Sequence, residues 1–185
     1  MAWQDLSDEE LVRRFNAGDT GAFEGLFRRY EVAMYRLARA RVASEDAALD
    51  IVQETFLKAY QGLGKLRSGP AFRAWLYRVC LNVAAGSARS EARRRRAETD
   101  AAERLEEVGE PIQTMLKQEG LRRLQSALSR LPRLLADTLI LREIEGRSYS
   151  EISEVMKCSE KAVEMRLFRA RRLLRRAMAA QEGMP

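Results

Sequence analysis

Apolar residues recur at intervals of three and four positions along most of the chain, a spacing that places them on one face of an α-helix. No stretch alternates apolar and polar residues as a half-buried strand does, so the predicted fold class is all-α, in two small helical bundles. The pattern predicts a short helix after Ser7, longer ones from Thr20 and Ser44, others over residues 71–85, 113–131 and 133–145, and a final pair beginning at Ser148 and Ser159.

The final pair of helices, over residues 148–176, has the pattern of a helix-turn-helix. Ser148 followed by Glu151 is a capping box, which opens the first helix, and Ser159 caps the second. The second helix keeps one continuous core-facing seam, made of Val163, Leu167, Ala170, Leu174 and Ala177.

The face opposite that seam is basic. Residues 157–176 carry eight cationic and two anionic side chains, a net charge of +6, which equals that of the whole chain. A solvated amphipathic helix can carry such a charge, but the caps, the turn and the seam together favour DNA binding. Such a helix fits the major groove, with its N-terminal side chains at base edges and its cations on phosphates.

The helix predicted over residues 71–85 follows a basic, glycine-rich loop over residues 62–70. Its expected core face consists of Phe72, Trp75, Leu76, Val79 and Val83. The same helical spacing directs Arg73, Tyr77, Arg78 and Asn82 outward.

An acidic segment separates the two halves of the chain. Residues 97–110 contain six acids and one arginine, and Pro111 closes the segment. We therefore predict a first domain over residues 1–96, a flexible linker over 97–117 and a second domain over 118–185. As a coil, such a linker would hold its ends only ~25 Å apart on average, so the two domains would seldom bind widely spaced DNA sites together and would gain little from being joined. We expect each domain alone to bind DNA weakly.

Composition argues against several functions. The chain has no histidine, which removes the usual general base, and we expect Cys80 and Cys158 to be small buried hydrophobes rather than metal ligands. Asp46, Asp50 and Glu54 repeat every four residues, a spacing more typical of surface charge than of a metal site. We find no long apolar window and no signal-peptide pattern, so we expect a cytoplasmic protein without stable membrane insertion.

Six further stretches occur in a characteristic order. The N-terminal half contains ELVRRFNAGDTGAFEGLFRRY, DIVQETFLKAY, and FRAWLYRVCLNVA followed by RRRR. The C-terminal half contains LSRLP, LILREIEGRSYSEISEVM and SEKAVEMRLFRARRLLRR. In this order, with an acidic linker between the halves, they resemble the bacterial RNA polymerase sigma factors of the extracytoplasmic-function (ECF) group, in the sigma-70 family.

The resemblance implies an alternative sigma factor that binds core RNA polymerase and promoter DNA. An anti-sigma factor is a further implied partner, and neither a cofactor, a small-molecule substrate nor an enzymatic activity is expected. The implied core-polymerase-binding residues are Asp50, Gln53, Glu54 and Phe56. Those implied for the minus-10 element are Lys65, Arg67, Ser68, Arg78 and Asn82. Those implied for the minus-35 element are Ser159, Lys161, Glu164, Met165, Arg166, Phe168, Arg169 and Arg172.

The chain departs from the family pattern in the helix-turn-helix. Lys157 stands where the family usually has glycine, so we expect a non-glycine residue in the left-handed conformation, at a cost of about 1 kcal/mol or more. Glu164, Met165 and Phe168 make the expected reading face less polar than usual. Met and Phe can touch thymine methyl groups and Glu can accept from cytosine, although the same residues could instead pack on a protein.

Two other functions fit parts of the sequence. A stand-alone helix-turn-helix regulator would explain the C-terminal half, and a stable dimer on a palindromic target would favour it. An enzyme acting on nucleic acid would need catalytic groups that the sequence does not supply in a recognisable motif.

Overall fold

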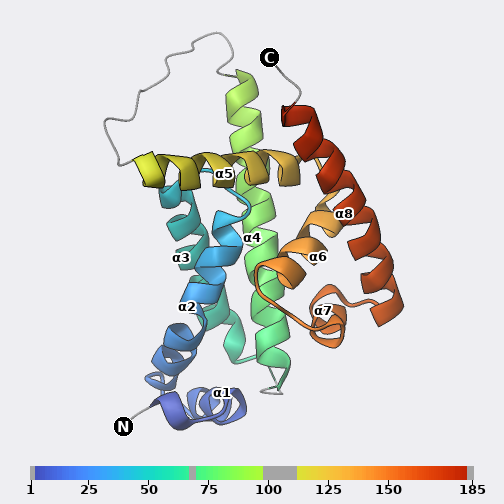
Figure 1. Ribbon diagram of the computed structural model, residues 1–185. Helices are drawn as coiled ribbons and strands as arrows, with labels where there is room; N and C mark the ends of the chain where they lie inside the picture. The colour runs from blue at the N-terminus through green and yellow to red at the C-terminus, as the bar shows by residue number, and fades with distance from the viewer. Residues whose placement is uncertain (1–2, 67–69, 98–111, 183–185) are drawn as a thin grey trace.

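The computed structural model describes residues 3–66, 70–97 and 112–182, and Figure 1 shows that this part of the chain is helical. The elements are η1 (Trp3–Asp5), α1 (Asp8–Asn16), α2 (Ala22–Arg39), α3 (Glu45–Leu63), α4 (Pro70–Ala97), α5 (Ile112–Ser129), α6 (Arg133–Glu143), α7 (Tyr149–Met156) and α8 (Glu160–Glu182). The all-α fold class is therefore confirmed. None of the described helices is both long and apolar enough to cross a membrane.

Four serines begin helices as their positions in the sequence predict. The hydroxyl groups of Ser7, Ser44 and Ser148 each accept a hydrogen bond from the backbone N–H three residues later. Ser159 does the same for the N–H of Ala162 at the start of α8. Each bond satisfies one of the donors that a helix leaves unpaired at its N-terminus, which fixes where these four helices begin.

Helices α1 to α4 form the N-terminal bundle. Its aromatic residues pack edge to face or tilted, with Phe23 on Phe56 at 6.2 Å and Phe27 on Phe56 at 4.6 Å between ring centroids. Leu26, Met34 and other fully buried residues complete the core of this bundle. The short turn η1 was not predicted, and Trp3 in it packs against the bundle.

Helices α5 to α8 form the C-terminal bundle, with α7 and α8 as the helix-turn-helix. Ser148 and Glu151 make the predicted capping box in both directions. Lys157, between the two helices, adopts the left-handed conformation with φ 49° and ψ 55°, as its place in the motif predicts. The turn thus keeps the backbone shape that glycine would take most easily.

The two bundles pack against each other along α4. Figure 1 shows α4 in the middle of the molecule, with α2 and α3 on one side and α6, α7 and α8 on the other. Buried residues of both bundles belong to one continuous hydrophobic cluster. Polar contacts also cross the boundary: Arg41 pairs with the buried Asp137 at 2.9 Å, and the Gln125 amide donates to the Val42 carbonyl at 2.8 Å.

Several element bounds differ from the expected ones. Helix α4 runs on to Ala97, well past residue 85. Helix α5 begins at Ile112, close to the helix start predicted at residue 113, so residues 112–117 are helical although they were also assigned to the linker. Residues 112–117 contain no acidic side chain, and the helical spacing of apolar residues from 113 onward accounts for their place in α5. The remainder of the expected linker, residues 98–111, lies outside the described part of the chain.

Candidate nucleic-acid interface

Helix α8 presents one face that no other described element covers. The side chains predicted to form this face are all exposed, and they are Lys161, Glu164, Met165, Phe168, Arg169 and Arg172. Phe168 is 62% exposed and Met165 46%, which is unusual for such large apolar side chains. Val163, Leu167 and Ala170 on the opposite face are fully buried, so the core seam fixes which side of α8 faces outward.

Two predicted residues of this helix differ from the rest. Ser159 is taken up in capping α8, so its hydroxyl holds the helix start in place. Arg166 is only half-exposed, and its guanidinium lies 3.3 Å from the Cys158 sulfur at the turn. Arg166 is therefore turned partly back toward the protein, at the edge of the exposed face. Cys158 is half-buried, not fully buried as expected.

The second candidate surface lies on α4 and on the turn that precedes it. Lys65 is exposed, and the backbone carbonyl of its neighbour Leu66 accepts a hydrogen bond from the Asn16 side chain at 3.3 Å. Arg67 and Ser68 lie outside the described residues. The structure thus ties one end of the predicted loop to α1.

Arg78 and Asn82 are directed away from the N-terminal core, as predicted, but both contact the C-terminal bundle. Arg78 Nη1 donates to the carbonyl oxygen of Glu154 at 2.8 Å. Asn82 Oδ1 accepts from Arg133 Nη2 at 2.5 Å. Each of the two predicted minus-10 residues on α4 thus bonds to the C-terminal bundle through one atom, while Arg78 stays half-buried and Asn82 exposed.

The prediction that Tyr77 faces outward is wrong. Its helical position does point it away from the N-terminal core, but the C-terminal bundle covers that side of α4, and Tyr77 is fully buried. Its hydroxyl donates to Glu145 Oε2 at 3.0 Å and accepts from Arg147 Nη2 at 2.7 Å. Burial, and then the carboxylate of Glu145, raise the pKa of Tyr77, which keeps the phenol protonated as a donor.

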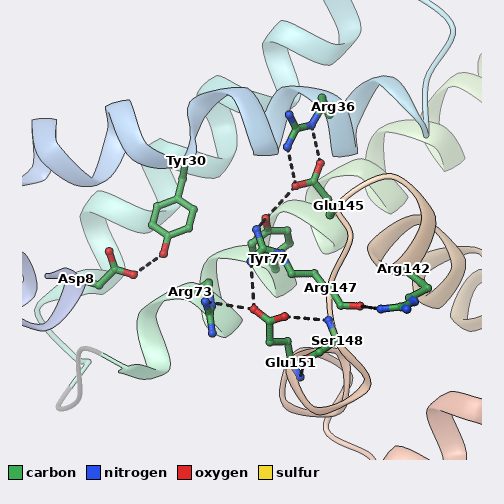
Figure 2. A network of polar contacts seen from close by, with 10 residues as sticks. All are labelled: Asp8, Tyr30, Arg36, Arg73, Tyr77, Arg142, Glu145, Arg147, Ser148 and Glu151. Carbon is green, nitrogen blue, oxygen red and sulfur yellow. Dashed lines mark hydrogen bonds and ion pairs between the residues drawn. The ribbon is translucent and has the colours of Figure 1, made fainter. Parts of the chain in front are cut away.

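Glu145 lies at the centre of a polar network between the bundles, shown in Figure 2. Its side chain has no exposed surface, and Arg36 contacts both of its oxygens, at 3.0 and 3.2 Å. Gly146 adopts φ +64°, a conformation suited to glycine, and this turn lets Glu145 and Arg147 both reach Tyr77. We call Arg36, Tyr77, Glu145 and Arg147 the interbundle latch.

A third candidate surface lies on α3. Asp50, Gln53 and Glu54 are exposed, and Glu54 pairs with Lys58 at 2.6 Å. Phe56, which the resemblance placed with them, is only 5% exposed. Its predicted direct contact with a partner is wrong, because the ring packs inside the bundle, where it supports α3 from behind.

An apolar groove of about 420 Å³ adjoins these acids between α2 and α3. It is lined by Phe27, Glu31, Val32, Tyr35, Leu49, Val52 and Gln53. Val32 and Leu49 are 57% and 46% exposed. Sequence reasoning missed Val32 and Tyr35. A usable signal was present, because Val32 and Leu49 are apolar residues outside the buried seams of their helices.

No group of three or more histidine, cysteine, aspartate or glutamate side chains within the described ranges could hold a metal ion. The acids of α3 lie along one helix face, where they give that surface a negative charge. Their arrangement is suited to contact with a basic partner.

Comparison with known proteins relates both bundles to one family. Residues 26–94 match Sigma-70 region 2, and residues 121–174 match Sigma-70, region 4. The ECF RNA polymerase sigma-E factor of Haemophilus influenzae is 36% identical over 180 residues, which cover 92% of this chain and 95% of that protein. The RNA polymerase sigma-H factor of Pseudomonas aeruginosa is 34% identical over 180 residues, 92% of this chain and 93% of that protein.

Solved structures agree. CnrH, in complex with the cytosolic domain of CnrY, superposes with a TM-score of 0.72 at 29% identity, over 94% of this chain and 97% of CnrH. The sigma factor RpoE of Bartonella quintana, solved with the anti-sigma factor NepR, shares the fold with a TM-score of 0.61 at 23% identity, over 85% and 96% of the two chains. Both bundles match sigma-70 regions, and relatives named as ECF sigma factors match this chain over nearly their whole length. The chain therefore belongs to the sigma-70 family, as an RNA polymerase sigma factor of the ECF group.

Proposed function

We propose that this sigma factor binds core RNA polymerase through α3 and the adjoining groove, the minus-10 element through α4 and the preceding loop, and the minus-35 element through α8. The exposed cationic face of α8 carries this proposal. A helix held by its cap and seam, with its cations facing solvent, can enter a major groove without rearrangement of its own bundle.

On α8 we assign two kinds of contact. Arg169 and Arg172 lie far along the helix, where side chains reach phosphates, and phosphate contacts supply affinity with little sequence preference. Lys161, Glu164, Met165 and Phe168 lie nearer the N-terminal end, which enters the groove in helix-turn-helix proteins. We assign base discrimination to these four. Ser159 and Arg166 remain proposed minus-35 residues at the edge of this face.

On α3 the proposed docking surface combines charge with an apolar groove. Asp50, Gln53 and Glu54 form its polar edge, and exposed Leu49 and Val32 form its apolar part. Such a combination is typical of a protein-binding site, in which apolar contacts give affinity and charges give orientation.

On the N-terminal side, Lys65, Arg67, Ser68, Arg78 and Asn82 remain our proposed minus-10 residues. We further propose the domain bounds 1–96 and 118–185, with a linker over 97–117. The protein acts by binding rather than by catalysis, which the lack of histidine supports. We place it in the cytoplasm beside core polymerase, with an anti-sigma factor as a further partner. Its structural relative CnrH was solved in complex with the cytosolic domain of another protein, CnrY, which supports a further protein partner.

The test is transcription in vitro from a randomised promoter library, with core polymerase alone and with core plus this protein. We expect transcripts with defined starts only when both are present, and the active templates should share two short elements. Binding to a palindromic target without core, and no gain in transcription, would instead indicate a stand-alone regulator.

A further inference from the structure

Two exposed apolar side chains lie beside an exposed carboxylate on α8. Met165 and Phe168 are 46% and 62% exposed, and because they are three residues apart they are neighbours on the helix surface. Glu164 is exposed as well, and none of the ion pairs between described residues involves its carboxylate. We call Glu164, Met165 and Phe168 the reading cluster.

The core seam of α8 fixes the direction in which the reading cluster points. Val163 and Leu167, which alternate with the cluster along the helix, are fully buried. Turning Met165 or Phe168 inward would rotate these two side chains out of the core and expose them to water. Figure 1 shows α8 along one side of the molecule, with α6 and α7 between it and α4. The cluster therefore faces outward without any rearrangement of its bundle.

The apolar part of the cluster selects one chemical group on the edges of the bases. In the major groove the C5-methyl group of thymine is apolar, whereas the other distinguishing groups are hydrogen-bond donors and acceptors. Met165 and Phe168 gain most from leaving water when they pack on such a methyl group. From Glu164 to Phe168 the helix rises ~6 Å, which is about two base-pair steps. The cluster can thus contact adjacent base pairs together.

The carboxylate of the cluster needs a donor on the DNA. Phosphates repel Glu164, and an ionised carboxylate only accepts hydrogen bonds, so its partner is an amino group of cytosine or adenine. The amino group of adenine lies between two acceptors, its own N7 and O4 of thymine. The amino group of cytosine has an acceptor on one side only, O6 of guanine. Cytosine therefore repels the carboxylate less and is its better partner.

The surroundings of the cluster favour DNA over a protein as the occupant. Lys161, Arg169 and Arg172 are exposed and border the cluster along α8. Cations around a small apolar spot match the phosphates that line a major groove. A protein interface buries roughly 800 Å² on each side, which is far more than two side chains supply.

We propose that the reading cluster recognises a cytosine amino group through Glu164 and the methyl groups of neighbouring thymines through Met165 and Phe168. This inference rests on the function proposed above and names the base chemistry that α8 reads. It follows that the minus-35 element of this sigma factor contains a cytosine and at least one thymine within two or three adjacent base pairs. It also follows that thymine methyl groups contribute to its affinity.

The experiment begins with binding-site selection by the full-length protein on randomised duplexes. Fluorescein-labelled duplexes of the selected sequence are then made with single thymines replaced by deoxyuridine, which removes the methyl group and keeps every hydrogen bond. The test variants are Met165→Ala, Phe168→Ala and Glu164→Gln. Arg172→Ala serves as the control for the two apolar residues. Glu160→Gln is the matched control for Glu164, because it removes the same charge from another exposed position of α8.

We expect deoxyuridine at a contacted position to weaken binding about threefold to fivefold, as the loss of one buried methyl group predicts. Met165→Ala or Phe168→Ala should bind the thymine and deoxyuridine duplexes equally at the position that each residue contacts. Arg172→Ala should bind both duplexes more weakly but keep their ratio. Selection with Glu164→Gln should lose the preference for cytosine and accept adenine, to which glutamine can bond in two places. Glu160→Gln should select the wild-type sequence.

A selected sequence without thymine, or deoxyuridine duplexes that bind as tightly as the thymine duplexes, would overturn the proposal. A methyl effect that persists in both alanine variants would do the same. If these two variants bind DNA normally but bind core polymerase more weakly, the apolar spot contacts protein, and the proposal is wrong. If the protein directs no transcription with core, the proposed function fails, whereas the duplex titrations still report whether α8 reads methyl groups.

Discussion

The phenolic oxygen of Tyr77 lies 3.0 Å from Oε2 of Glu145, although the two residues belong to different bundles and stand 68 positions apart in the chain. This contact buries a tyrosine on a helix face that is otherwise polar. It also joins the helix assigned to the minus-10 element to the segment that leads into the helix-turn-helix. The structure therefore connects the two promoter-binding halves directly, independently of the linker between them.

The acidic edge of α3 should be needed for binding to core polymerase. We expect Glu54→Lys to weaken binding to core, because it reverses a charge at the proposed docking surface, while the free energy of unfolding changes by no more than about 0.5 kcal/mol. Glu24→Lys is the matched control. Both acids have side chains that are 53% exposed, and both pair with a cation four residues later. Equal affinities of the two variants for core, in a fluorescence titration, would exclude this docking surface.

On α8 the two kinds of contact should respond differently to salt. Arg169→Ala should weaken binding to the minus-35 duplex about equally for all sequences, and should lower the slope of log K against log salt by about 0.9 for the lost phosphate contact. Glu164→Ala should instead change which bases are preferred. Binding-site selection on both variants tests this division between phosphate contacts and base contacts. If both variants select the wild-type sequence, the division is wrong.

Lys157 holds a left-handed conformation that costs a lysine more than a glycine. We expect Lys157→Gly to raise the free energy of unfolding by up to about 1 kcal/mol, part of the gain being lost to the greater freedom of glycine in the unfolded chain. Lys157→Val, which places a branched side chain at the same φ, should destabilise the protein. Urea unfolding of both variants measures the effect, and a lower stability for the glycine variant would contradict it.

The capping box should make stability depend on pH. A hydrogen bond from the Ser148 backbone N–H lowers the pKa of Glu151 below its ordinary value. A carboxylate whose pKa is lower in the folded state contributes stability above its unfolded pKa, and this contribution is lost as the pH falls through the folded pKa. The stability difference between wild type and Glu151→Gln should therefore be full at neutral pH and shrink below about pH 4. A difference that is constant with pH would show that ionised Glu151 adds nothing.

Local patterns in the sequence predicted most of the fold, because caps and periodicity act within one helix. Ser44 and Ser148 are examples, whereas the left-handed conformation of Lys157 was expected from the resemblance. The exposed face of α8 was likewise predictable, since its buried seam is regular. The same reasoning failed for Tyr77, because a helical wheel shows which side faces away from its own bundle but not what packs on that side.

Phe56 shows a limit of the family resemblance rather than of the helical wheel. The resemblance grouped it with its exposed neighbours on α3, whereas its ring is buried and packs on Phe23 and Phe27 of α2. The apolar residues Val32 and Leu49 outside the buried seams were visible in the sequence, but the groove that they line together was not, because it requires the relative placement of α2 and α3. The pairing of Arg78 with the end of α7 is also a tertiary contact, between residues 76 positions apart in the chain.

One measurement tests most directly whether this sigma factor is closed when free and opens to read a promoter. Spin labels are attached at Ala43→Cys in the N-terminal bundle and Ala179→Cys in α8, which are both exposed positions. Double electron–electron resonance then measures the distance between the two bundles. Cys158→Ser removes the half-buried thiol, and burial raises the pKa of the Cys80 thiol to about 12, so that it does not react with the label. The free protein should give one narrow distance, and addition of core polymerase with promoter DNA should replace it with a clearly longer one, as expected for elements about two helical turns, or roughly 70 Å, apart. The same distance in the free protein and in the promoter complex would contradict the opening of the chain.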